Sequence, residues 1–134
     1  MSTAENKELM QHIFAALAKS NPRPFEDAMA EDFRWTMLGS NPWSKTYDGK
    51  AVVVGELFPA LRRKMDRITT IAHRFIADGV HVAIEARGAN TTRAGVPYCN
   101  NYCFVFRLAD GKLKDVTEYM DTELVTAVLG DPER

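Results

Sequence analysis

The sequence has almost no net charge and no long apolar run. Its 17 basic and 18 acidic residues leave a net charge of −1 over 134 residues, so no broad positive field exists to attract nucleic acid. No run of about 18 apolar residues could span a membrane, and the N-terminus lacks the basic and then apolar segments of a signal peptide. We therefore expect a cytoplasmic protein that binds neither nucleic acid nor a membrane.

Cysteine is scarce, and neither cysteine nor histidine is spaced for a metal. Cys99 and Cys103 lie on one predicted strand, roughly 13 Å apart, whereas a disulfide needs Cα atoms within about 7 Å. The histidines, at positions 12, 73 and 81, form neither an HxxxH nor an HExxH pattern. The sequence therefore predicts no disulfide, no metal site and no cofactor.

The first half of the chain has the pattern of three helices around one short strand. Apolar residues recur at helical spacing over residues 6–19, and the turn-forming residues 20–22 end this run. A second, short helix follows, and residues 32–37 then alternate as a strand. The third helix is expected over residues 49–65, with a kink at Pro59.

Alternation with a period of two dominates the second half. Asp-Gly pairs at residues 78–79 and 110–111 lie between alternating apolar runs, which is typical of β-hairpins. Four strands are expected, over residues 67–77, 80–89, 99–109 and 112–120, before a last helix over residues 122–129. A single domain over residues 1–134 follows. It is predicted to be α+β, with a curved antiparallel sheet packed against three N-terminal helices and a short C-terminal helix.

The first hairpin places a histidine among apolar residues. A two-residue turn at Asp78-Gly79 would pair Phe75 with Val82 and His73 with Ile84. The shared face then carries Phe75 and Ile84, and His73 is its one polar residue. A lone histidine on such a face is either a core residue bonded to the backbone or an acid-base group, and both interpretations stay open.

The second hairpin predicts a pocket. A two-residue turn at Asp110-Gly111 would set three inward-facing pairs: Phe104 with Thr117, Tyr102 with Tyr119, and Asn100 with Asp121. This face changes from apolar to polar toward the C-terminus, as expected of a pocket with an apolar floor and a polar mouth. If the register slipped by one residue, the opposite set would face inward instead: Asn101, Glu118 and Met120.

Three segments carry a resemblance to a known family. "HRFIADGVHVAIEARG", "YCNNYCFVFRLADGKL" and "TEYMD" follow one another after the helical first half. In this order the chain resembles the SnoaL-like branch of the nuclear transport factor 2-like superfamily, which includes ketosteroid isomerase. The resemblance implies a cone-shaped barrel with an apolar cavity, and a homodimer formed through the outer face of the sheet.

The resemblance also implies candidate site residues. SnoaL-type polyketide cyclases carry an acid-base aspartate at the position of Asp121, and scytalone dehydratase carries a histidine at a position similar to His73. The positions that match the acid-base residues of ketosteroid isomerase hold Met37, Ile13 and Asn101. Asp121 is at the same time the natural N-cap of the last helix, where its carboxylate would accept from free backbone N–H groups.

Two functions remain open at this point. The chain could be a cofactor-independent isomerase, cyclase or lyase that acts on a small carbonyl compound by acid-base catalysis. The predicted catalytic residues are Asp121, His73 and Tyr102. The predicted ligand-binding residues are Trp35, Met37, Phe75, Ile84, Asn100, Phe104 and Tyr119. Alternatively, the same fold could bind an apolar ligand without catalysis or serve as a dimerisation module.

Overall fold

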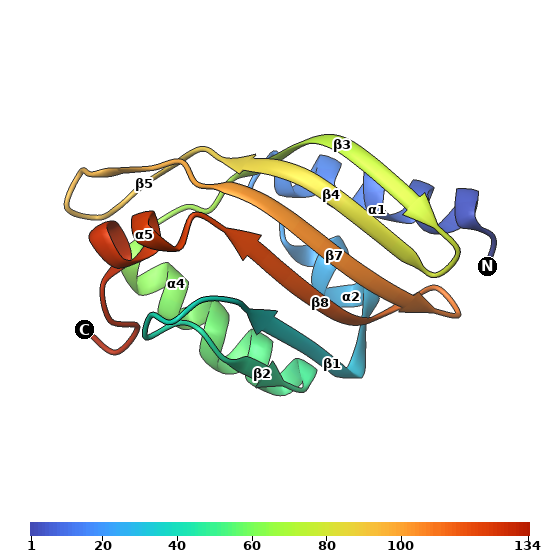
Figure 1. Cartoon of the computed structure of the whole chain (residues 1–134), viewed down its shortest axis with the longest axis horizontal. Helices are drawn as coiled ribbons and strands as arrows, with labels where there is room; N and C mark the ends of the chain where they lie inside the picture. Colours follow the sequence, from blue (N-terminus) through green and yellow to red (C-terminus); the bar gives the residue numbers. More distant parts are fainter.

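The helices of the chain lie against one face of a curved six-stranded sheet (Figure 1). The computed structural model describes all residues, 1–134. Its helical segments are α1 (Thr3–Leu17), α2 (Arg23–Ala28), α3 (Lys50–Val52), η1 (Val53–Leu57), α4 (Phe58–Lys64), α5 (Thr122–Leu124) and η2 (Val125–Leu129). No helix is both long and apolar enough to cross a membrane. The α+β class predicted from the sequence is confirmed.

The sheet is mixed, with strand order β2-β1-β8-β7-β4-β3. Its strands are β1 (Met29–Met37), β2 (Thr46–Asp48), β3 (Thr70–Asp78), β4 (His81–Gly88), β7 (Asn101–Ala109) and β8 (Lys112–Met120), while β5 (Asn90–Thr91) and β6 (Pro97–Tyr98) form a separate ribbon. The four long strands of the two hairpins pair antiparallel, as predicted, while β1 pairs with β8 in parallel, which was not predicted from the sequence. Hairpin signals report only strands that follow one another in the chain, and these two are separated by most of it.

α1 is anchored at both its start and its buried face. Ser2 and Glu5 form a reciprocal capping box at its N-terminus. Its inner side buries Met10, Ile13 and Phe14 and packs mainly on β3. Asn6 is also buried and donates from Nδ2 to the backbone oxygen of Gly79 at 3.0 Å, so the helix is tied to the β3–β4 turn.

The predicted third helix forms, but as three consecutive segments. η1 separates α3 from α4 and has a wider, π-helical turn, in which Phe58 N–H donates to the oxygen of Val53. Pro59 follows directly, in the first turn of α4. Because proline has no N–H and clashes with the preceding turn, a local widening of the helix at this point is expected.

The first hairpin turns one residue later than predicted. Asp78 pairs with His81, so the turn is Gly79-Val80, and Phe75 pairs with Ile84 rather than Val82. Phe75 keeps its inward face, because the partner changes by two residues. A bulge between Ala72 and Arg74 leaves His73 unpaired and exposed. The predicted position of His73 on the apolar face is therefore wrong, since a bulge re-aims the extra side chain.

The second hairpin contains the bulge that decides the candidate site. Its turn pairs Ala109 with Lys112 as predicted, but the register shifts after Leu113 because Lys114 is an extra residue. Glu118 consequently pairs with Phe104 and lies inside. Tyr119 faces outward and is 48% exposed, so its predicted inward position is wrong. The alternative register placed Asn101, Glu118 and Met120 inside. This is correct for Glu118 and Met120, whereas Asn101 is exposed.

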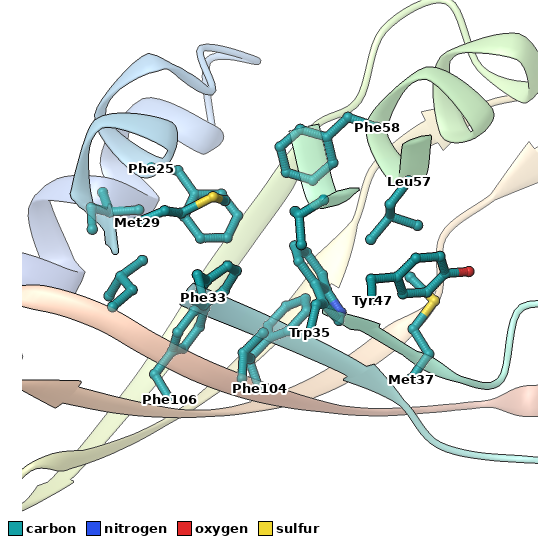
Figure 2. Packing of buried hydrophobic residues seen from close by; sticks show 14 of the residues in the cluster. Phe25, Met29, Phe33, Trp35, Met37, Tyr47, Leu57, Phe58, Phe104 and Phe106 are labelled. Atoms are coloured by element: carbon teal, nitrogen blue, oxygen red, sulfur yellow. The ribbon is translucent and has the colours of Figure 1, made fainter. Parts of the chain in front are cut away.

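The core contains a continuous group of aromatic rings. Figure 2 shows Phe25, Phe33, Trp35, Phe58, Phe104 and Phe106 packed between the sheet and the helices. Their ring centroids lie about 6 Å apart, and most pairs meet edge to face, as between Trp35 and Phe58 at 5.9 Å and 90°. Such pairs add stabilisation to the burial of the rings themselves. They also leave irregular space between large planar groups.

We expect Asn6→Ala to lower the free energy of unfolding by about 1 to 2 kcal/mol, because the Gly79 carbonyl loses its donor. Urea unfolding followed by tryptophan fluorescence would measure the change. Glu8→Ala, an exposed site on the same helix, is the matched control and should change stability by less than about 0.5 kcal/mol. Equal effects of the two substitutions would contradict an anchoring role for Asn6.

Candidate functional site

The barrel contains two adjoining chambers. The outer chamber has a volume of about 300 Å³ and lies between α1, α2, α4 and the sheet. The inner chamber has a volume of about 80 Å³ and lies toward the C-terminal end of β8. Five residues line both chambers: Trp35, Leu61, Ile68, Thr70 and Phe104. The two chambers therefore share part of their walls.

A carboxylate lies at the inner chamber. The parallel register pairs Trp35 with Val116, which places Glu118, two residues later, on the same face of the sheet. Trp35 donates from Nε1 to Glu118 Oε1 at 2.8 Å, and Glu118 is only 5% exposed. In Figure 2 the indole nitrogen of Trp35 points away from Phe25 and toward the side of Tyr47 and Met37.

The surroundings of Glu118 raise the pKa of its carboxyl. Burial raises its pKa from 4.5 to about 7, although the hydrogen bond from Trp35 opposes the rise. Oε1 accepts the only hydrogen bond of this side chain. Every fully buried side-chain oxygen in the structure has a hydrogen-bonding partner. Oε2 has no such partner, so it is not fully buried and has open space beside it. This space is the inner chamber, which Glu118 lines.

Two tyrosine hydroxyls share the inner chamber with this carboxyl. Burial, with the nearby charge of Glu118 as a smaller cause, raises the pKa of Tyr98 to about 12 and that of Tyr102 well above 10. Both hydroxyls therefore stay protonated at neutral pH and can donate hydrogen bonds. Asn100 donates from Nδ2 to the Tyr98 oxygen at 3.0 Å. The hydrogen bond between the two hydroxyls lowers the pKa of Tyr98 and raises that of Tyr102, so Tyr102 is its donor and the Tyr98 proton stays free for another acceptor.

Asn100 joins the site to the end of β8. It is completely buried, and its amide makes two further hydrogen bonds to the backbone of Asp121, one as donor and one as acceptor, both at 3.0 Å. The side chain therefore links the β8–α5 junction to the Tyr98 hydroxyl. Both N–H donors and one oxygen lone pair of this amide are used within the protein, and its role in ligand binding stays a prediction.

Asp121 caps the last helix. Its Oδ1 accepts from the backbone N–H groups of Glu123 at 3.1 Å and Leu124 at 3.2 Å, as an N-cap does. The side chain is exposed and lines neither chamber. The N-cap that the sequence predicts is thus confirmed, while the catalytic role that the resemblance implies stays a prediction.

The structure divides the predicted site residues into three groups. Four line the cavity: Trp35, Met37, Tyr102 and Phe104. Three are inside the barrel but line neither chamber: Phe75, Ile84 and Asn100. Three are exposed: His73, Tyr119 and Asp121. Asp121 and His73 therefore do not form a pair across the cavity.

The spacing of apolar residues in β8 contains a signal for the inward position of Glu118. Leu113 and Val116 are both buried, yet they are three residues apart, which breaks the period of two within one strand. Side chains on the same face of a regular strand are an even number of residues apart, so this odd spacing indicates a bulge between Leu113 and Val116. It would have moved Glu118 to the inner face. Tyr98 has no comparable signal, because it lies in the ribbon of β5 and β6, in a segment with the composition of a loop.

The arrangement can perform acid-base chemistry on a bound carbonyl compound. A carboxyl that titrates near pH 7 can take and return a proton, and protonated hydroxyls beside it can hold a developing negative oxygen. The structure contains no group of three or more His, Cys, Asp or Glu side chains that could hold a metal ion.

Comparison with known proteins identifies one family. The model of the SnoaL-like domain matches residues 10–116. The match covers part of α1, the helical segments from α2 to α4 and most of the sheet, and it ends two residues before Glu118, so the candidate carboxylate lies just outside it. No curated protein matches this sequence.

Solved structures share the fold over nearly the whole chain. An NTF2-like protein from Burkholderia thailandensis E264 is 23% identical, covers 96% of this chain and 98% of its own, and has a TM-score of 0.81. TerC, co-crystallised with polyporic acid, is 17% identical over 92% and 97% of the two chains, with a TM-score of 0.79. A protein with a ketosteroid isomerase-like fold from Catenulispora acidiphila DSM 44928, in complex with trimethylamine, is 18% identical over 93% and 94%, with a TM-score of 0.74.

The raised pKa of Glu118 predicts how stability depends on pH. The pKa of Glu118 is about 7 in the folded protein, above its ordinary 4.5. At any pH between these two pKa values, unfolding releases a proton. The free energy of unfolding therefore falls as the pH rises through this range to about 7. Glu118→Gln has no proton to lose. The free energy of unfolding of the wild type should therefore fall by up to about 3 kcal/mol relative to this variant between about pH 4.5 and 8.

Urea unfolding at a series of pH values would measure this difference. Glu123→Gln removes an exposed acid from the same segment and should keep the pH dependence of the wild type. A constant difference between the wild type and Glu118→Gln across this range would contradict the raised pKa.

Proposed function

The chain belongs to the SnoaL-like domain family, and from this premise we propose that it binds a small apolar carbonyl compound in the barrel and moves a proton on it with Glu118. The observation that carries the proposal is the buried Glu118 carboxyl, whose pKa is about 7 and whose second oxygen adjoins the inner chamber. A buried carboxyl without a positive partner destabilises the fold. Its position at a cavity, rather than in the packed core, supports a functional role.

The proposed step is a proton transfer next to a carbonyl group. Glu118 Oε2, as the carboxylate, takes a proton from the carbon beside the carbonyl, and the electron pair of that C–H bond forms an enolate. The hydroxyl of Tyr98 or Tyr102 donates a hydrogen bond to the enolate oxygen. If a C=C bond is conjugated with the enolate, Glu118 returns the proton to the far carbon of this dienolate, which completes an isomerisation. Alternatively, the enolate carbon attacks a second carbonyl carbon within the ligand, the π electrons of that carbonyl move to its oxygen, and the alkoxide takes the proton back from Glu118, which closes a ring.

The cavity and the relatives support a ligand of this class. The two chambers offer aromatic walls and few polar groups, as small-molecule sites commonly do. A relative with the same fold was co-crystallised with polyporic acid. The absence of Asp121 and His73 from the cavity favours Glu118 as the acid-base group in this chain.

Hydrogen–deuterium exchange on a model ketone tests this proposal. We expect the wild type to accelerate exchange of the α-protons of 2-tetralone in D2O, with a rate that rises through a midpoint near pH 7 as Glu118 ionises. Glu118→Gln should lower the accelerated rate by about 100-fold, the usual size of a general-base contribution. Proton NMR measures the exchange directly.

Asp121→Asn is the matched control, because asparagine also caps helices well and should leave the exchange rate unchanged. A loss of exchange in Asp121→Asn but not in Glu118→Gln would transfer the role to Asp121. Binding of the ketone without any exchange would leave only the non-catalytic alternative, a ligand-binding protein.

We also propose that two copies associate through the outer face of the sheet. At its centre the outward side chains are small or apolar, with Val105 paired between Ala83 and Thr117. Two larger apolar side chains on this face remain exposed, Ile76 at 55% and Tyr119 at 48%. An apolar centre surrounded by polar groups is typical of interfaces between protein chains.

Val105→Lys should convert the proposed dimer to a monomer, because it places a charge at the centre of the interface. Light scattering after gel filtration would show a change from twice the chain mass to the chain mass. Thr46→Lys, an exposed position on edge strand β2, should leave the dimer intact. A wild type that is monomeric at micromolar concentration would contradict the proposal.

A further inference from the structure

We propose that the ligand of this cavity is an apolar keto acid, whose anionic group is bound by Arg62 and Arg67 at the mouth while its carbonyl end lies beside Glu118. This inference rests on the proposed function, because it names the class of compound that the same cavity takes. The contact with the anionic group is inferred from separate observations at the opposite end of the cavity.

The lining of the outer chamber changes from apolar to basic toward solvent. Its deep wall consists of buried aromatic side chains, including Trp35 and Phe104. Its exposed lining residues are Pro22, Arg62, Asp66 and Arg67. A ligand that fills the chamber therefore ends among charged groups.

The one acid at this mouth is already paired. Asp66 Oδ1 lies 3.2 Å from Arg93 Nη1. The other guanidinium nitrogens of Arg93, Nε and Nη2, donate to the backbone oxygen of Arg62 at 3.1 and 2.8 Å. Arg62 and Arg67 are not part of any ion pair in the structure. The mouth thus presents two arginines without an ion-pair partner.

Arg67 is held in position for a ligand. Its Nε donates to Ser20 Oγ at 2.9 Å, and the Ser20 and Thr69 hydroxyls are hydrogen-bonded to each other. Ser20 has a φ of 60°, a left-handed conformation that costs a non-glycine residue energy and often marks a functional position. Only one of the five N–H donors of the guanidinium is used, so the pair of terminal nitrogens can bind a carboxylate through two parallel hydrogen bonds.

The inner end of the cavity excludes the anionic group. Glu118 lies there, and a second carboxylate beside it would suffer repulsion between like charges in a buried space. The two tyrosine hydroxyls suit a neutral carbonyl oxygen instead. Since Trp35 and Phe104 line both chambers, one elongated molecule can place its carbonyl group in the inner chamber and its carboxylate at the mouth.

A matched pair of ligands tests the charge requirement. 6-Acetyl-2-naphthoic acid and its methyl ester share one aromatic body and one ketone and differ in the anionic group. We expect the wild type to bind the acid at least about ten-fold more tightly than the ester, measured by calorimetry at low salt, because charged hydrogen bonds to arginine are the stronger ones. Added salt should reduce this preference.

Substitutions at the mouth locate the contact. Arg67→Gln should weaken binding of the acid by about ten-fold and leave that of the ester unchanged, and Arg62→Gln should act in the same direction. Arg63→Gln is the control, since Arg63 lies on α4 beside Arg62 but does not line the cavity. Its affinities should match those of the wild type.

The outcomes separate this inference from the function on which it rests. Equal affinity for acid and ester, or equal loss of both in Arg67→Gln, would overturn the keto acid and leave carbonyl binding in place. Failure of both compounds to bind would overturn the proposed function and the inference with it. Selective loss of acid binding in Arg67→Gln and Arg62→Gln, but not in Arg63→Gln, would establish the anion contact.

Discussion

The hydrogen bond between Trp35 and Glu118 connects the fold of this protein to its candidate site. It joins residues 83 positions apart, and it exists because β1 pairs in parallel with β8. Without the indole donor the buried carboxyl would have no hydrogen-bonding partner in the protein, which would cost several kcal/mol. Trp35 also lines both chambers. The orientation of one side chain therefore determines the shape of the cavity and the position of its acid.

Two acids three residues apart have different roles because of their surroundings. Asp121 is exposed and uses its carboxylate to cap a helix, whereas Glu118 is buried and keeps one oxygen beside a chamber. Asn100 connects the two regions, since it binds the backbone of Asp121 and the hydroxyl of Tyr98. The cap thus stabilises the end of β8, while Glu118 lies at the wall of the inner chamber.

Much of the fold and part of the site could be predicted from the sequence. Asp-Gly pairs and alternating apolar residues predict both hairpins, and helical spacing predicts the helices that cover the sheet. The same alternation places Trp35, Met37, Tyr102 and Phe104 inside, and all four line the cavity. His73 and Tyr119 were misplaced because a period of two cannot be extended through a bulge, where one extra residue changes the face of the residues beyond it.

The sequence by itself determined which segments become helices and strands, because these depend on periodicity, capping residues and turn residues that act over a few positions. Only the tertiary structure decided which carboxylate reaches the cavity. Glu118 reaches the cavity because of the bulge at Lys114 and the parallel pairing of β1 with β8. Neither feature can be predicted from the positions of the hairpin turns in the sequence. Burial then raised the pKa of Glu118 to about 7, because the cost of a charge depends on the whole surrounding barrel rather than on the residues beside it in the chain.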